Sequence, residues 1–113
     1  EYPQICICRT YFEYYSEDGV LSGYMAANEM NGAAVKGVYP YIKHFALNDQ
    51  ETNRCSFLLT FASEQTIREG YLKAFELATK GFCAVKGFEG NAIAAMSSFN
   101  WIGTVPSCAN NGF

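Results

Sequence analysis

One stretch, residues 38–54, limits what this chain can fold into more than any other. Its first half is apolar, aromatic and β-branched, and its second half is polar, with carboxylates and an arginine. The first half favours a half-buried strand, and the Asn, Asp and Thr residues of the second half favour a turn. Lys43 and His44, the chain's only histidine, stand at the junction. Enzymes built on parallel strands collect their sites where the strands end, so this junction is a candidate ligand site.

Strand and helix patterns alternate along the whole chain. The expected strands are short apolar runs at residues 4–8, 38–45 and 92–97, and a helical pattern lies between each successive pair. A polar loop follows the second strand to about Ser56, and the chain beyond Gly103 is expected to be turn-like. This alternation predicts an α/β fold in which parallel strands are joined by right-handed helical crossovers.

The first helix is expected over about residues 20–35. The side chains of Ser16, Glu17 and Asp18 offer capping oxygens and negative charge before it, and Gly37 is a common helix stop. Two internal glycines weaken this prediction, because glycine is a poor helix former. They are Gly23 and Gly32.

The second helix has the strongest pattern of the chain and runs from Ser63 to about Gly81. Its apolar residues recur every three to four positions and form one face. They are Ile67, Tyr71, Phe75 and Ala78. Acidic and basic residues four apart are expected to pair on the opposite side. The pairs are Glu69 with Lys73 and Glu76 with Lys80.

Length and charge narrow the classes of protein to which the chain can belong. Its 113 residues suffice for one domain, and a hydrophobic fraction of 50% argues against disorder. A net charge of -3 argues against a nucleic-acid partner, and no apolar run approaches the roughly 20 residues of a membrane helix. The sequence begins at Glu1 without a signal-peptide pattern, so we expect it to start inside a longer protein.

The cysteines do not suggest disulfides or a metal site. Their number is odd and their spacing irregular, which is not a disulfide framework. They are Cys6, Cys8, Cys55, Cys83 and Cys108. Cys6 and Cys8 resemble half of a metal site, but no second pair with a histidine follows at ligand spacing. We expect buried or incidental thiols and a reducing, cytoplasmic compartment.

Several separate motifs carry a resemblance to a known family. The first is Lys43-His44-Phe45 followed by Asn48 to Arg54, and upstream of it lie Phe12 to Asp18 and Leu21-Ser22-Gly23. Downstream lie Ile67-Arg68-Glu69, Tyr71-Leu72, Phe75-Glu76 and Met96-Ser97-Ser98-Phe99-Asn100. These motifs, spread over roughly residues 9–103, resemble in content and order the segments of glycoside hydrolase family 3, the β-glucosidase and β-xylosidase family.

The resemblance implies a TIM-type (β/α) barrel, which periodicity alone does not distinguish from a doubly wound sheet. A full barrel needs about 250 residues, so residues 1–113 would form an incomplete N-terminal barrel domain. It would contain about three parallel strands and two crossover helices. The remainder of the barrel and a second domain are then the expected partners, and open strand edges favour self-association.

The resemblance also implies an activity, the retaining hydrolysis of terminal β-linked glucose or xylose from small carbohydrates. That chemistry needs two carboxyl groups about 5–5.5 Å apart, a nucleophile and an acid/base. In the family the nucleophile follows the Ser-Ser-Phe-Asn-like segment in a motif that this sequence lacks, and the acid/base also comes from elsewhere. We therefore assign no catalytic residue, including Asp49 and Glu51, and expect the chain alone to be inactive. No metal or organic cofactor is implied.

Four residues are candidate sugar contacts by this resemblance. Lys43 and His44 match the family's Lys-His pair, which hydrogen-bonds sugar hydroxyls, and charged donors make strong hydrogen bonds. The alternative is a core histidine beside a surface lysine. Arg9 matches a family arginine with one extra residue before Phe12, and otherwise would be a surface arginine pairing with a nearby glutamate. Met96 matches a subsite-lining position, but could equally be strand packing.

The remaining polar residues of the first stretch are expected to shape the loop. Asp49, Glu51 and Arg54 would form an ion-pair and turn network. Residues 82–91 are longer than the corresponding family segment, as an insertion would be. The alternative to a glycosidase is a noncatalytic sugar-binding or self-associating module.

Overall fold

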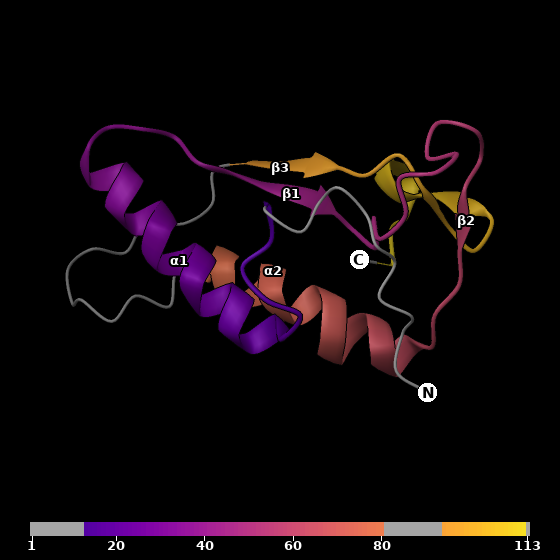
Figure 1. Ribbon diagram of the computed structural model, residues 1–113, viewed down its shortest axis with the longest axis horizontal. Coiled ribbons are helices and arrows are strands. Elements are labelled where there is room, and N and C mark those ends of the chain that lie inside the picture. Colours follow the sequence, from indigo (N-terminus) through magenta and orange to yellow (C-terminus); the bar gives the residue numbers. More distant parts are fainter. Residues whose placement is uncertain (1–12, 81–93, 113) are drawn as a thin grey trace.

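The computed structural model describes residues 13–80 and 94–112. Two helices lie side by side on one face of a pair of parallel strands, and a small second sheet stands at the far end (Figure 1). The elements in chain order are α1 (Gly19–Val35), β1 (Tyr41–Phe45), β2 (Leu59–Thr60), the π-helical turn η2 (Thr66–Tyr71), α2 (Leu72–Thr79), β3 (Ala94–Ser97), β4 (Trp101–Ile102), β5 (Val105–Pro106) and the 3-10 turn η3 (Ser107–Ala109).

Helix α1 begins and ends where the sequence predicts. The Asp18 carboxylate caps it by accepting hydrogen bonds from the N–H groups of Val20 and Leu21. The chain leaves the helix through Gly37, whose φ of +77° lies in the left-handed region that glycine adopts without strain. The predicted capping and the predicted stop are both confirmed.

Gly23, which weakened the helix prediction, has a packing role. A Cβ at Gly23 would lie 2.6 Å from the Leu77 Cβ, so α1 and α2 approach each other closely at this point. Gly19, one turn earlier, has the Gly70 carbonyl oxygen 2.5 Å from the position of a Cβ. A Cβ at Gly32 would instead meet nothing within 4 Å. The close approach of the helices thus accounts for glycine at 19 and 23 but not at 32.

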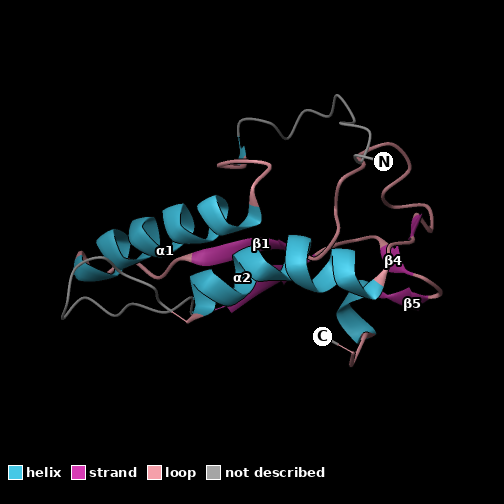
Figure 2. Cartoon of the chain, turned by 90° about the horizontal axis from the view of Figure 1, so that it is seen from below, coloured by secondary structure: helices cyan, strands magenta, loops and turns pink. Residues whose placement is uncertain are grey.

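The second helical region packs its predicted apolar face onto the sheet. Ile67 and Ala78 are buried, and Tyr71 and Phe75 pack at the edge of the core. The Phe75 ring meets the Phe45 ring edge-on, with centroids 5.0 Å apart, which joins α2 to β1. Figure 2 shows both helices on the same side of the β1–β3 pair.

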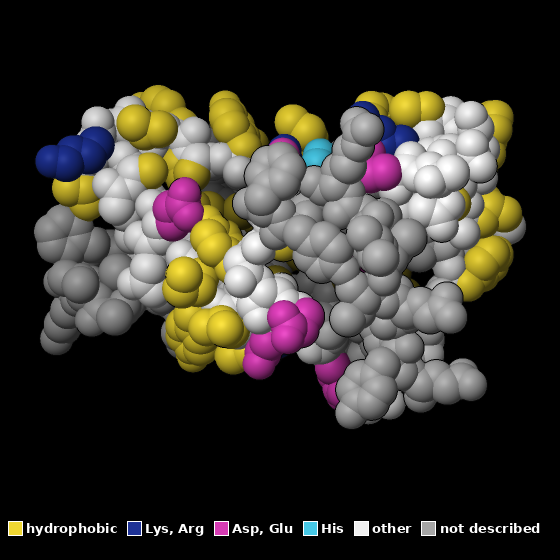
Figure 3. All heavy atoms as spheres, in the orientation of Figure 1, with side chains coloured by type: hydrophobic (Ala, Val, Ile, Leu, Met, Phe, Trp, Pro, Cys, Tyr) yellow, Lys and Arg dark blue, Asp and Glu magenta, His cyan; other side chains and the backbone are white. Residues whose placement is uncertain are grey.

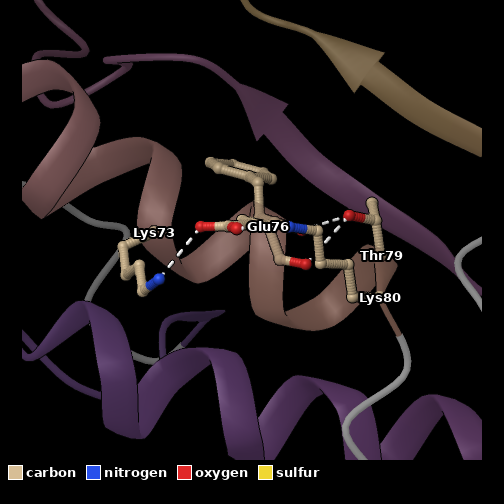
Figure 4. A network of polar contacts seen from close by, with 5 residues as sticks. Lys73, Glu76, Thr79 and Lys80 are labelled. Carbon is tan, nitrogen blue, oxygen red and sulfur yellow. Dashed lines mark hydrogen bonds and ion pairs between the residues drawn. The ribbon is translucent and has the colours of Figure 1, made fainter.

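One of the two ion pairs predicted on this helix is wrong. Residues 66–71 form a π-helical turn. Within this region Glu69 accepts a hydrogen bond from Gln65, one turn earlier, while Lys73 pairs with Glu76 at 3.0 Å, so each of the two residues has another partner. The Glu76–Lys80 pair is confirmed at 2.5 Å. Hydrogen bonds from Lys80 and Lys73 lower the pKa of Glu76 to about 2 (Figure 4).

The sheet confirms the parallel α/β prediction in the described residues. β1 and β3 are parallel, with Tyr41 opposite Ala94 and Lys43 opposite Met96. They occupy the C-terminal parts of the runs predicted as strands. The predicted strand at residues 4–8 and the long loop at 82–91 lie outside the described residues.

The end of the chain is more regular than the sequence suggests. Instead of turns alone, β4 pairs in parallel with β2 and in antiparallel with β5. Each of these strands has only two residues, so no alternating pattern could identify them. In the described ranges no helix is long and apolar enough to cross a membrane.

Candidate functional site

The candidate site lies at the C-terminal ends of β1 and β3. Lys43 and Met96 are register partners whose side chains share one face of the sheet. It is the face away from the helices, because the adjacent residues Ile42 and Ala95 line a pocket together with Leu72 and Phe75 of α2. The register shifts between Lys43 and Phe45, which makes His44 an extra residue in β1. Such bulges re-aim side chains and are frequent beside active sites. The Lys43–His44 and Phe45–Ala46 peptide bonds are both cis.

Lys43 is held by a carboxylate at the rim of the site. Its Nζ lies 2.8 Å from the Glu13 Oε2, and both side chains are more than a third exposed. The hydrogen bond from Lys43, followed by the charge of Lys43, lowers the pKa of Glu13. The exposed ammonium group carries three N–H donors, which leaves some of them available to an incoming hydroxyl group.

His44 is half-buried and keeps an unused ring nitrogen. Its Nδ1 is buried and has no hydrogen-bond partner among the described residues. Its backbone N–H donates to the hydroxyl of Tyr14, whose pKa is raised mainly by burial. Burial and then the charge of Lys43 lower the pKa of His44, against the opposing charge of Glu13. The imidazole is therefore neutral at pH 7, with one donor and one acceptor nitrogen, as suits a hydroxyl group.

The loop after β1 contains the polar contacts that the sequence predicted for Asp49, Glu51 and Arg54. Arg54 Nη1 lies 3.0 Å from the Glu51 Oε2, and the guanidinium carbon stands 5.4 Å from the centre of the Phe99 ring. The Asp49 carboxylate accepts a hydrogen bond from the Tyr71 hydroxyl. Burial, followed by this bond, raises the pKa of Tyr71. The charges of Glu51 and Arg54 also act on His44, so this network borders the site.

A cluster of buried polar side chains bonds to the backbone directly after His44. Ser98, Asn100 and Ser107 are all buried, and their side chains bond to the backbone of Phe45 and Ala46. No local sequence pattern predicts this cluster, because its members lie 52 to 62 residues from the backbone groups they bond. Only a signal that couples distant positions could have found it.

The structure describes three of the four residues predicted as sugar contacts. The structure brings Lys43, His44 and Met96 together, and Met96 is 54% exposed. Arg9 lies outside the described residues. Sequence reasoning missed Glu13, which bonds Lys43, and Tyr14, which bonds His44.

The thiols and possible metal ligands form no further site in the described ranges. Cys55 and Cys108 are exposed, not buried, and both are free. Cys6, Cys8 and Cys83 lie outside those ranges. No group of three or more His, Cys, Asp or Glu side chains among residues 13–80 and 94–112 is placed to hold a metal ion.

Comparison with curated proteins identifies relatives of one kind. No family model matches the chain. It is 54% identical over 69 residues to a β-glucosidase of Ruminococcus albus, covering 61% of this chain and 7% of that protein. It is 37% identical over 115 residues to β-glucosidase B of Emericella nidulans, covering 96% of this chain and 12% of that protein. The chain thus spans about a tenth of the length of these relatives.

Solved structures agree with the curated relatives. The chain superposes on β-glucosidase 3B from Thermotoga neapolitana, solved in complex with glucose, with a TM-score of 0.77 and 41% identity over 88% of this chain and 13% of that one. DesR, a β-glucosidase from Streptomyces venezuelae, gives a TM-score of 0.71 and 35% identity over 84% of this chain and 11% of that one. Sequence and fold therefore agree with the resemblance: the chain's structural neighbours are β-glucosidases of glycoside hydrolase family 3, and it matches one segment of them.

Proposed function

We propose that this chain contributes part of the sugar-binding subsite of a retaining β-glycosidase that acts on terminal β-linked glucose or xylose. The observation that carries the proposal is the pairing of an exposed lysine with a neutral histidine at the ends of parallel strands. Lys43 supplies charged donors, and His44 has a buried Nδ1 without a partner in the described residues. The relatives named β-glucosidase support the same class of substrate.

The chemistry of the site suits binding better than bond cleavage. A sugar hydroxyl is both donor and acceptor, and the lysine, the neutral imidazole and the Glu13 carboxylate together offer both roles. The three carboxylates of the site are already paired, Glu13 with Lys43, Glu51 with Arg54, and Asp49 with Tyr71. We therefore place the nucleophile and the acid/base of the parent enzyme outside this chain, which alone should not turn over glycosides.

We also propose that the described elements are part of a TIM-type barrel. Adjacent parallel strands, with helices on one face and the candidate site at their C-terminal ends, are the repeating unit of that fold. In this arrangement Met96 would line the subsite beside Lys43, and Arg9 would reach it from the preceding segment. The rest of the barrel and a second domain are the partners that would complete the site.

A binding experiment tests the proposal directly. We expect glucose to shift the NMR signals of Lys43 and His44 in the 113-residue chain, and Lys43→Met to weaken binding about tenfold, the usual effect of losing one charge-assisted hydrogen bond. Lys36→Met, at the exposed end of α1, is the matched control and should bind as the unmodified chain does. Equal affinity in both variants would contradict the assignment of Lys43.

The second candidate function is a noncatalytic module that binds sugar and associates with itself. The large exposed apolar surface favours it: Phe57 is 74% exposed and Phe61 73%. Apolar side chains also lie in several patches on the face that Figure 3 shows. A stable symmetric dimer that binds glucose, and loses that affinity on Lys43→Ala, would favour this module over a part of a larger enzyme.

A further inference from the structure

We propose that Ser98, Asn100 and Ser107 are positioning residues, which fix the backbone directly after His44 and thereby set the directions of the Lys43 and His44 side chains. These three residues act through their bonds to Phe45 and Ala46, the two residues that follow His44. Their consequence for sugar binding rests on the proposed function, whereas their effect on the imidazole does not.

The three side chains bond to consecutive backbone groups. The Ala46 N–H donates to the Ser107 Oγ at 3.1 Å, and the Ser107 hydroxyl lies 3.1 Å from the Phe45 carbonyl oxygen. The Ala46 carbonyl oxygen accepts from the Ser98 hydroxyl at 2.8 Å and from the Asn100 Nδ2 at 3.3 Å. The backbone N–H of Ser98 donates to the Phe45 oxygen at 2.8 Å.

An inventory of protons identifies Ser107 as the residue that matters most. Each hydroxyl has one proton to donate, and the two serine oxygens are only 3.0 Å apart. If Ser98 donates to Ala46, Ser107 can donate to Phe45, and both carbonyl oxygens are satisfied. Each of these oxygens has a second donor, the Ser98 N–H or the Asn100 amide. The Ala46 N–H, however, has the Ser107 oxygen as its acceptor, and a buried N–H without an acceptor is costly.

The position of His44 in the strand explains why these bonds matter there. As the extra residue between Lys43 and Phe45, His44 lies outside the regular pairing of β1 with β3. Its direction therefore depends on how the chain is held on either side of the bulge. On the C-terminal side of the bulge, Ser98, Asn100 and Ser107 hold the backbone of Phe45 and Ala46 in place. Ala46 and Asn100 are both 0% exposed.

The competing explanation is that this cluster only fastens the two sheets together. Asn100 also donates to the Thr60 hydroxyl oxygen at 3.2 Å, which links β1 to β2. A fastener of that kind would affect stability but leave the surroundings of His44 unchanged in the folded molecule. The state of the imidazole distinguishes the two roles.

His44 offers an isolated signal because the chain has one histidine. We would follow its imidazole by NMR from about pH 5 to 8, a range that brackets the usual histidine pKa. The charged groups around it are Lys43, Glu13, Arg54 and Glu51. The proposed variants keep all of these charges, so a change in the pKa of His44 would report a change in its position.

The principal variant is Ser107→Ala in the 113-residue chain. We expect the pKa of His44 to rise toward its usual value, because the ring loses part of its burial and moves away from Lys43. Ser107→Thr keeps the hydroxyl oxygen and should restore the original pKa. Ser22→Ala is the matched control, since it removes a hydroxyl that bonds the Ser16 carbonyl oxygen at 2.8 Å within the α1 region.

Two further measurements complete the test. If Ser107→Ala does not fold, Ser98→Ala replaces it, because the Asn100 amide still serves the Ala46 oxygen in that variant. Since Ser98→Ala loses the shorter bond to that oxygen, at 2.8 Å, it should raise the pKa of His44 in the same direction by a smaller amount. An unchanged pKa of His44 in a folded variant overturns the positioning role. Glucose binding should weaken about tenfold in Ser107→Ala, as expected for misplaced binding groups. If the unmodified chain binds no glucose while the pKa of His44 shifts as expected, the proposed function fails and the positioning role stands.

Discussion

His44 makes the stability of this chain depend on pH in a window where few other groups titrate. Its pKa in the folded state is lowered, chiefly by burial, so the unfolded chain binds a proton more readily than the folded one. Stability from this group is complete above the unfolded value of about 6.5 and is lost as the pH falls through the folded pKa. The free energy of unfolding should therefore decrease on acidification from about pH 7.5.

The His44→Gln variant isolates that effect. Urea unfolding at about pH 7.5, 6.5 and 5.5 would give the slope for each protein, and carboxylates contribute equally to both. Between about pH 7.5 and 5.5, we expect the free energy of unfolding of the variant to change less with pH than that of the unmodified chain. Parallel curves for the two proteins would show that the imidazole is not desolvated in the folded state.

Glu13 should report directly on the contact with Lys43. The hydrogen bond and the charge of Lys43 hold the pKa of Glu13 below 4.5. In Lys43→Met the pKa should return toward that value, measured from the side-chain carboxyl carbon by NMR. Lys36→Met, which leaves this pair intact, should leave the titration unchanged. A Glu13 titration that is indifferent to Lys43 would mean that the rim of the site is open in solution.

At the scale of residues, the sequence predicted the side chains of the candidate site but not the residues that bond to them. Lys43 and His44 stand out because a strand pattern ends at the only histidine, and Met96 follows from a motif. Their roles in sugar binding stay predictions. Glu13 pairs across 30 positions of sequence, and Ser107 meets Ala46 across 61. A local pattern carries no information about partners at such distances.

Two glycines of α1 give a matched test of the helix packing. A methyl group at Gly23 would lie 2.6 Å from the Leu77 Cβ and 3.1 Å from the Ala74 carbonyl oxygen. Gly23→Ala should therefore destabilise the chain by about 1–3 kcal/mol, the usual cost of overpacking. Gly32→Ala meets nothing within 4 Å and should stabilise it by about 0.5–1 kcal/mol, because alanine restricts the unfolded chain and favours the helix.

Thermal or urea midpoints of both variants would decide the matter. Opposite signs for the two substitutions confirm that α1 and α2 touch at Gly23. Two stabilised proteins would mean that α1 does not approach α2 in solution, since both sites would then behave as exposed helix positions.

At the scale of elements, strong local signals were sufficient and weak ones were not. The cap at Asp18 and the stop at Gly37 set the limits of α1, and the apolar repeat identified the second helix. The π-helical turn at 66–71 has no such signal, and the Glu69–Lys73 pair was wrongly predicted because Glu69 bonds Gln65 and Lys73 bonds Glu76. The two-residue strands β2, β4 and β5 are too short for any repeat and arise from tertiary pairing.

The whole molecule exposes more apolar surface than a stable monomer normally tolerates. On α1, neighbouring apolar side chains about half exposed form one stripe. They are Val20, Leu21, Tyr24 and Met25. β1 and β3 form a sheet of two strands, which leaves an unpaired edge on each side in the described residues. We expect the isolated chain to associate, with a molar mass above 12.5 kDa in light scattering at micromolar concentrations.

The form of this association separates the two proposed functions. Surfaces that belong against the rest of a barrel have no reason to be self-complementary, so a part of a larger enzyme should give a polydisperse distribution. Leu21→Lys with Met25→Lys should shift that distribution toward 12.5 kDa, whereas Lys36→Met should not. A single symmetric dimer that survives dilution would instead indicate a surface selected for pairing, in favour of the module. A monodisperse monomer at every concentration would contradict both expectations, because it would require these apolar faces to be stable in water.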